Sequence, residues 1–370
     1  MATRSEAAPN PVTGILAWIV RLLVSLFVPV VAFIVLYVGF LFLRDANAPK
    51  PVMALVAILW GVGGVALLFV AANWVVERMP LKWRGRILPF VFVGPALIML
   101  GWFLALPVVR TFFQSLLKGN TEQFIGFDNY AYALTNNTMR EAFVNNILWI
   151  VFGTGLSVFF GLLIAVLADR SRFENVAKSF IFMPMAISFV GAGIIWRFVY
   201  YYQPAGTEQI GLLNAIATGF GGDPVAWIVQ TARPWNNFFL IFILVWLQTG
   251  FTMVLISAAL KGVPVELLEA ARIDGANEWQ AFWRVIMPQI WGTVVTVSTT
   301  VVIATLKIFD IVKVMTNGNF GTEVIASQQY KQFFEAGDYG RGAAIAIVLL
   351  IGVIPVMVYN LRQFRERRAF

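Results

Sequence analysis

Cysteine and histidine are both missing from this chain of 370 residues, and only 12% of the residues are charged. Without cysteine the chain forms neither disulfides nor thiolate metal sites, and without histidine it lacks the most common metal ligand. Acidic residues within apolar runs are also scarce, so a membrane-embedded enzyme would lack the nucleophile, base or metal cluster that it needs. We therefore predict no metal site and no catalytic residue.

Nucleotide chemistry and nucleic-acid binding are disfavoured as well. The sequence lacks the phosphate-binding pattern Gly-x4-Gly-Lys-Ser/Thr, so a process that consumes ATP would need a partner chain to hydrolyse it. The net charge of +8 is compatible with nucleic acid. In a membrane protein, however, Lys and Arg gather on cytoplasmic loops, which is the more economical explanation. We predict no cofactor in this chain and no nucleic-acid partner.

Apolar residues are abundant and make up 59% of the chain. A soluble domain would not tolerate this share, so we predict an all-α, polytopic integral membrane protein in contact with lipid. Because the apolar layer of a bilayer is about 30 Å thick and a helix rises about 1.5 Å per residue, a run of about 20 apolar residues can span it. About eight runs qualify, at residues 22–43, 52–76, 87–109, 144–168, 179–196, 237–260, 290–306 and 343–359.

Orientation follows from Lys and Arg, which are unequally distributed between alternate loops. The richer set includes both termini and the loop at residues 261–289, which places them in the cytoplasm of a bacterial or archaeal cell, with the helices in its plasma membrane. The first run precedes a small-x-small pattern at residues 46–48, as a signal peptide would. It exceeds the roughly 7–15 apolar residues of such peptides, so we favour a retained anchor.

The loop at residues 261–289 is the most informative segment. Pro264 suits the first turn of a helix, and Glu269 lies near the positive end of that helix. Ala271 and Gly275, four residues apart, form a small-residue notch, and Gly275 is predicted to end the helix. A second short amphipathic helix is predicted by Trp279, Phe282 and Ile286 ahead of Pro288. On periodicity alone, a docking element and a helix pair lying on lipid are equally compatible.

A known pattern runs through this loop: Glu269-Ala270-Ala271, three residues, Gly275, nine residues, Val285, one residue and Met287-Pro288. It resembles the signature loop of the membrane subunits of bacterial ATP-binding-cassette importers, in which Ile and Leu occupy the positions of Val285 and Met287. In that family the loop fits a groove on the ATPase subunit and transmits nucleotide-driven motion. The resemblance implies ATPase-coupling roles for Glu269, Ala270, Ala271, Asp274, Gly275 and Pro288.

Other segments are similar to the sugar-importing branch of that family. They are Ile195-Trp196-Arg197 ahead of Gly211-Leu212-Leu213-Asn214, and Phe309-Asp310 ahead of Thr316-Asn317-Gly318. The resemblance implies a six-helix, type I importer permease core at residues 87–365, after a cytoplasmic tail and two extra helices at residues 1–86. Eight spans resemble the larger, maltose-transporter-type subunit. Implied partners are a second homologous permease, two ATP-binding subunits and an extracytoplasmic sugar-binding protein. The segment from Thr316 to Val324, which contains Asn319-Phe320-Gly321-Thr322-Glu323, is similar to alpha-glucoside permeases, which implies a di- or trisaccharide such as maltose, trehalose or sucrose.

A sugar pathway needs hydrogen-bonding groups together with aromatic faces for the apolar C–H surfaces. The candidates are Trp246, Gln248, Thr249, Phe251, Thr252, Lys307 and Asp310. Each hydroxyl could instead bond its own helix or a neighbouring one, and Lys307 and Asp310 could pair with each other at i and i+3. Gln248 is the strongest candidate, because a side-chain amide in hydrocarbon is costly unless it faces a cavity or a partner.

Two other functions stay open. A self-sufficient secondary transporter would need intramembrane carboxylates for a coupling ion and usually a repeat of helices, and only Asp310 comes close. A membrane-embedded enzyme would need the reactive groups excluded above. Dependence of transport on a separate ATPase would distinguish the importer from both.

Overall fold

The computed structural model describes residues 30–45, 48–77, 81–169, 172–229 and 234–367. Regular structure within them is helical, apart from one isolated bridge between Leu117 and Phe124, which confirms the all-α prediction. Packing divides the chain into two units, residues 1–108 and 109–370, and each is described by itself.

The helices have the following bounds. The first unit contains a helix at residues 30–45, α2 (Lys50–Glu77), α3 (Leu81–Leu100) and η1 (Gly101–Ala105), and α4 (Leu106–Ser115) crosses into the second unit. The second unit continues with α5 (Asp128–Thr135), α6 (Asn137–Leu148), η2 (Trp149–Thr154), α7 (Gly155–Asp169), α8 (Glu174–Phe182), η3 (Met183–Ala186), α9 (Phe189–Val199), α10 (Leu212–Gly219) and α11 (Trp235–Lys261). It ends with α12 (Val265–Ile273), α13 (Glu278–Ala281), η4 (Phe282–Ile286), α14 (Met287–Leu306), α15 (Asp310–Met315), α16 (Ile325–Tyr330), η5 (Lys331–Glu335) and α17 (Tyr339–Arg367).

The described residues include six helices that are long and apolar enough to cross a membrane: Lys50–Glu77, Arg84–Ser115, Asn137–Asp169, Trp235–Lys261, Glu278–Leu306 and Tyr339–Arg362. A seventh candidate is the broken pair Glu174–Ala186 and Phe189–Val199. These seven overlap seven of the predicted runs. The other run, at residues 22–43, begins outside the described residues, which are helical from 30 to 45. The predicted count of eight is therefore approximate.

The span predicted at residues 179–196 is bent by 102° between α8 and α9. Pro184 lies in the 3-10 turn η3, and Ser188 then caps α9 by accepting a hydrogen bond from a backbone N–H of its first turn at 3.0 Å. The end of α8, just before this turn, packs against α11 at Gly250, where an added Cβ would lie 2.5 Å from the carbonyl oxygen of Ile181. A glycine in α11 therefore makes room for the bend.

Helix α11 is the central helix of the second unit. Its fully buried apolar side chains are Leu240, Ile241, Ile243, Leu244, Met253 and Ile256. Because lipid tails are as apolar as leucine, helices associate in a membrane through close packing rather than through the hydrophobic effect. Gly161 of α7 permits such packing, since a Cβ added there would lie 2.7 Å from Thr252 Cβ and 2.9 Å from the backbone nitrogen of Met253.

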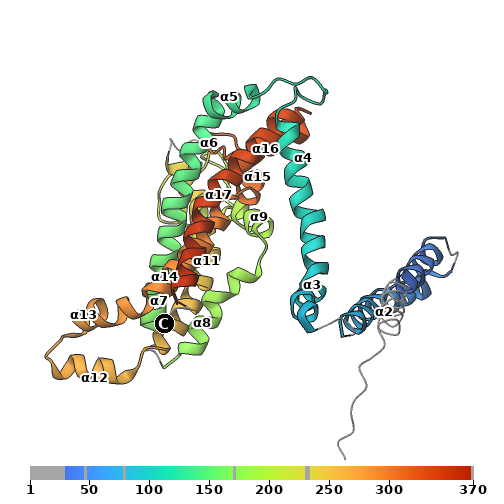
Figure 1. Cartoon of the computed structure of the whole chain (residues 1–370). Coiled ribbons are helices and arrows are strands. Elements are labelled where there is room, and N and C mark those ends of the chain that lie inside the picture. The colour runs from blue at the N-terminus through green and yellow to red at the C-terminus, as the bar shows by residue number, and fades with distance from the viewer. Residues whose placement is uncertain (1–29, 46–47, 78–80, 170–171, 230–233, 368–370) are drawn as a thin grey trace, which may run out of the picture. The chain divides into compact units, whose positions relative to one another are not determined.

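The second unit has two distinct ends along the direction of its long helices. Helices α12 and α13 lie at one end, where α17 also terminates, whereas α5 and α16 lie at the other (Figure 1). We call these the α12 end and the α16 end. The loop at residues 261–289 and the last helix thus reach the same end of the unit.

Candidate coupling and pathway sites

The first arm of the loop is helix α12. Pro264, which was predicted in its first turn, precedes it by one residue and has an extended backbone with ψ of 132°. The N–H of Ala276 donates to the carbonyl of Ala271 at 2.9 Å, across Gly275 with φ of +79°. This is the usual glycine-terminated helix end, because only glycine adopts such a φ without steric cost. Gly275 therefore ends the helix, as predicted.

The second arm begins with a capping box. The side chain of Asn277 accepts from the backbone N–H of Gln280 at 2.8 Å, and the Gln280 side chain accepts from the backbone N–H of Asn277 at 3.0 Å. An exposed ion pair between Arg272 and Glu278, at 3.1 Å, joins the two arms. The loop is thus a defined hairpin of two helices.

The second arm differs from the short separate helix that was predicted. Helices α13, η4 and α14 form one continuous span from Glu278 to Leu306. Pro288 does not break it, because the preceding turn η4 is a π-helix in which the N–H of Met287 donates to the carbonyl of Phe282. Movement of this arm would therefore pass directly into a membrane span.

The signature residues lie mainly on the surface of the hairpin. Ala271 is buried, whereas Glu269, Ala270, Asp274, Gly275 and Pro288 are exposed. A Cβ at Gly275 would meet no heavy atom within 4 Å, so its surroundings are open. Ile273 and Trp279 are large apolar residues with 85% and 71% of their surface exposed. Such an apolar surface is typical of a protein or lipid contact.

A charged cluster lies beneath the hairpin. Lys178 of α8 contacts Asp169 of α7 and Ser257 of α11, and donates to Glu174 at 2.6 Å. Lys261, the last residue of α11, pairs with Glu174 at 2.5 Å. The cluster therefore joins three helices where the loop begins. In the sequence these lysines indicate only topology, because pairing between helices has no signature in local spacing.

The two predicted threonines of α11 use their hydroxyls in packing. Thr249 donates to the carbonyl of Val245 in its own helix at 2.6 Å. Thr252, which is fully buried, donates to the carbonyl of Ser157 in α7 at 2.7 Å. Each hydroxyl therefore bonds its own helix or a neighbouring one, which was the alternative to a role in the sugar pathway.

The other α11 candidates, Trp246, Gln248 and Phe251, are partly buried. The ring of Trp246 lies edge-on to that of Trp196, with centroids 5.7 Å apart. Both tryptophans line an aromatic cavity of about 680 Å³, together with Tyr200, Leu212, Trp235, Phe238 and Phe242. The structure thus surrounds Trp246 with aromatic side chains from α9 and α11.

Lys307 and Asp310 lie on either side of a helix break. Helix α14 ends at Leu306, Lys307 is exposed, and Asp310 is the first residue of α15. The two residues therefore do not share a helical turn, and no ion pair between them is found among the described residues. The interruption of the apolar run at Lys307 correctly indicated where the span ends.

Four buried asparagines hold the segment at residues 316–325, here named the α15–α16 loop: Asn145 and Asn146 of α6, and Asn236 and Asn237 of α11. Asn145 donates to the carbonyls of Gly321 at 2.9 Å and Glu323 at 2.7 Å, and Asn146 accepts from the N–H of Ile325 at 2.9 Å. The asparagines of α11 donate to carbonyls of the same loop. Buried amides thus fix an irregular segment whose backbone groups would otherwise lack partners.

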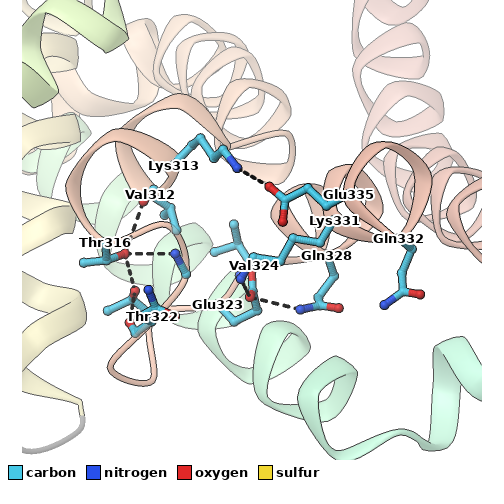
Figure 2. A network of polar contacts seen from close by, with 12 residues as sticks. Val312, Lys313, Thr316, Thr322, Glu323, Val324, Gln328, Lys331, Gln332 and Glu335 are labelled. Carbon is cyan, nitrogen blue, oxygen red and sulfur yellow. Dashed lines mark hydrogen bonds and ion pairs between the residues drawn. The ribbon is translucent and has the colours of Figure 1, made fainter. Parts of the chain in front are cut away.

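A buried carboxylate, that of Glu323, lies within this segment (Figure 2). The Glu323 side chain is 4% exposed and accepts from Lys331 at 2.6 Å and from Gln328 at 3.0 Å. Thr316 and Thr322 share a hydrogen bond of 2.6 Å nearby. These contacts satisfy a charge that would be very costly to bury alone. Sequence reasoning did not identify them, because Glu323 and Lys331 belong to different turns.

The geometry offers little for a metal ion. Over the part of the chain that the structure describes, no group of three or more acidic side chains could hold one. The carboxylates of Glu323 and Asp169 instead contact lysines.

Comparison with known proteins identifies the family of this chain. The family described as binding-protein-dependent transport system inner membrane component matches residues 157–369. The osmoprotective compounds uptake permease protein GgtC of Synechocystis sp. is 56% identical over 277 residues, covering 75% of this chain and 99% of that protein. The alpha-glucoside transport system permease protein AglF of Rhizobium meliloti is 51% identical over 284 residues, covering 76% and 84%.

A solved structure shares the fold. It is a crystal structure of a bacterial alginate ABC transporter in complex with an alginate-pentasaccharide-bound periplasmic protein, with a TM-score of 0.66 and 19% identity. The match covers 77% of this chain and 96% of that chain. The protein described here belongs to the family of inner membrane components of binding-protein-dependent transport systems.

Proposed function

We propose that this membrane permease subunit of an ATP-binding-cassette importer forms half of a pathway for a di- or oligosaccharide of the alpha-glucoside type. The observation that carries the proposal is the 51% identity to an alpha-glucoside permease over most of that protein. As a member of its family, the chain is a transport component, and ATP hydrolysis belongs to separate subunits. We propose that no cofactor binds to this chain.

The hairpin of α12 and α13 is proposed to dock on an ATP-binding subunit. Its exposed signature residues and the exposed Ile273 and Trp279 support this role, because a docking surface must be accessible in the isolated chain. The coupling residues are Glu269, Ala270, Ala271, Asp274, Gly275 and Pro288. Movement of the hairpin would reach the membrane through the continuous span Glu278–Leu306. The complete importer would contain a second permease, two ATP-binding subunits and an extracytoplasmic sugar-binding protein.

The sugar pathway is proposed to follow α11 and the break between α14 and α15. Trp246, Gln248 and Phe251 would face the sugar, with Thr249 and Thr252 beside them, and Lys307 and Asp310 would lie at the break. The partial burial of Gln248 supports this, because a glutamine within a long apolar helix needs a polar environment. A lipid-facing Gln248 would be unfavourable.

Orientation and domain organisation complete the proposal. The α12 end and both termini would lie in the cytoplasm, with the α16 end outside, as the distribution of Lys and Arg predicts. Residues 1–86 would add two helices to a core at residues 87–365. The Synechocystis relative supports this addition, since three quarters of the present chain matches almost the whole of that protein.

A second class of cargo is suggested by the description of one relative. The Synechocystis relative is described as a permease for osmoprotective compounds, and it is 56% identical to this chain. We propose osmoprotective compounds as a second candidate cargo, which would pass the same polar and aromatic groups.

The test is reconstitution of the complex that co-purifies with the tagged chain. Uptake of labelled maltose, trehalose or sucrose into vesicles, dependent on ATP and on the separate ATPase, is the expected result. Uptake driven by a proton or sodium gradient without the ATPase would contradict the proposal.

A further inference from the structure

A second cavity lies at the α16 end, away from the pathway residues proposed on α11. It has a volume of about 270 Å³ and is lined by Arg197, Tyr200, Tyr201, Tyr202, Ala226, Trp227, Ile228, Val229, Met315 and Phe320. Three segments that are distant in sequence contribute to it: the end of α9, the stretch after α10, and the α15–α16 loop. We propose that this cavity is a receiving site for one neutral pyranose ring before the sugar reaches α11, an inference that rests on the proposed sugar function.

The walls of the cavity are held in place by buried side chains. Asn214, which is fully buried, donates to the carbonyls of Tyr201 and Val225 at 3.0 Å each and accepts from the N–H of Val225 at 2.9 Å. Asn236 donates to the carbonyl of Phe320. Each of the three segments is therefore fixed by packing or by a buried amide, so the cavity is preformed. Preformed cavities lose less conformational entropy when they bind a ligand.

Phe320 gives the cavity an exposed aromatic face at a strained position. Its φ is +60°, a region that residues other than glycine, asparagine and aspartate seldom adopt, and its surface is 49% exposed. Neither packing nor backbone geometry favours phenylalanine there. Backbone strain of this kind is often retained where a side chain has a function, and an exposed aromatic face suits the C–H surface of a sugar ring.

The remaining lining groups match the hydroxyls of a sugar. Arg197 brings five N–H donors to the cavity, and no described carboxylate forms an ion pair with it. Tyr201 and Tyr202 add phenol groups that donate and accept. Because pockets for drug-sized ligands have volumes of about 300–1,000 Å³, a cavity of about 270 Å³ has room for about one ring rather than a whole trisaccharide.

The cavity is connected to the proposed pathway by Tyr200. This residue lines both the cavity and the larger aromatic cavity around Trp246. Its ring lies 5.1 Å from that of Trp196, which in turn lies 5.7 Å from that of Trp246. A sugar leaving the receiving site would thus meet aromatic faces on the way to α11.

The test uses the assembled complex with its binding protein, in vesicles, and the disaccharide among maltose, trehalose and sucrose that the wild type imports. F320N removes the aromatic face while suiting the backbone, because asparagine tolerates this φ. R197Q removes the charge. F220N makes the same change as F320N at a phenylalanine that is 90% exposed and lies outside the cavity.

We expect F320N and R197Q to lower uptake about fivefold to tenfold, as the loss of one aromatic or charged contact would. Co-purification of the subunits and ATP hydrolysis stimulated by the binding protein should be unchanged, and F220N should behave as wild type. Normal uptake by F320N and R197Q would overturn the receiving site but leave the importer function intact. If F320N or R197Q lost the stimulation of ATP hydrolysis by the binding protein, the receiving site would also be overturned, because the cavity would then hold part of that protein. Absence of sugar uptake by the wild type would overturn the proposed function, and the receiving site with it.

Discussion

The α16 end and the α12 end of the second unit are stabilised in opposite ways. At the α16 end, buried asparagines and the buried carboxylate of Glu323 hold an irregular loop, and their hydrogen bonds are within the chain. At the α12 end, the hairpin has an exposed ion pair, and Ile273 is 85% exposed. The first end is complete in the isolated chain, whereas the second presents a surface that suits a partner. Rigidity and docking are thus separated along the molecule.

Of the substitutions considered, removal of the Glu323 charge should have the largest effect on the difference between the two ends. E323Q would leave Lys331 without its carboxylate partner at a site where the glutamate side chain is 4% exposed. We expect a loss of about 2 kcal/mol in the free energy of unfolding, measured by denaturation of the purified chain in detergent. E278Q, which breaks the exposed pair with Arg272, should change it by less than about 0.5 kcal/mol. Equal losses in the two variants would remove the distinction between the ends.

Replacement of Gly275 should uncouple the importer without unfolding it. A β-branched residue at φ of +79° is strained by about 1–2 kcal/mol, and G275V would also place a side chain in the open space beside the hairpin. We expect sugar-stimulated ATP hydrolysis by the assembled complex to fall about tenfold. G275N is the control, because asparagine tolerates this backbone conformation. Unchanged stimulation in G275V would contradict the docking role.

Lys178 connects the α12 end to the membrane helices. K178M would leave Asp169 and Ser257 without their shared partner, which loosens the contact among α7, α8 and α11. We expect uptake into vesicles to fall about fivefold. K261Q removes only an ion pair whose lysine is 57% exposed, so its effect should be small. A larger loss in K261Q than in K178M would show that the partly buried contacts of Lys178 are not the connection.

The smallest of these effects is expected at Gln248. Q248L should lower uptake about threefold while the subunits still co-purify, because a hydrogen-bonding group of the pathway is replaced by an apolar one. The matched control is Q289L, at an exposed glutamine of the loop. Normal uptake in Q248L, measured with labelled sugar, would remove Gln248 from the pathway.

The spans and the hairpin could be predicted from sequence because each depends on local pattern. Apolar runs indicated the helices, and Gly275 indicated the end of α12. The 102° bend was not predicted, because Pro184 and Ser188 lie inside a continuous apolar run. Hydropathy shows that such a run is apolar, but it contains no information on the direction of the helix axis. The union of α13 with α14 was missed because a π-turn before Pro288 tolerates a residue that usually ends a helix.

The buried polar contacts could not be predicted for a different reason. Glu323 and Lys331 are eight residues apart, and Lys178 contacts Ser257 across 79 positions in sequence. Such pairs depend on how helices meet, which no local spacing encodes. Asn145 and Asn146 were visible as polar residues at the start of a span, yet their partners in the α15–α16 loop became evident only from the fold.

Site-specific cross-linking tests the central claim most directly, because the chain has no cysteine of its own. I273C on the exposed face of α12 and F220C in the loop between α9 and α11 each provide one thiol, and both positions are at least 85% exposed. With a thiol-to-amine reagent in the assembled complex, we predict that I273C cross-links to the ATP-binding subunit and that F220C does not. No cross-link from I273C, or equal cross-linking from both positions, would contradict the assignment of the α12 end as the coupling surface.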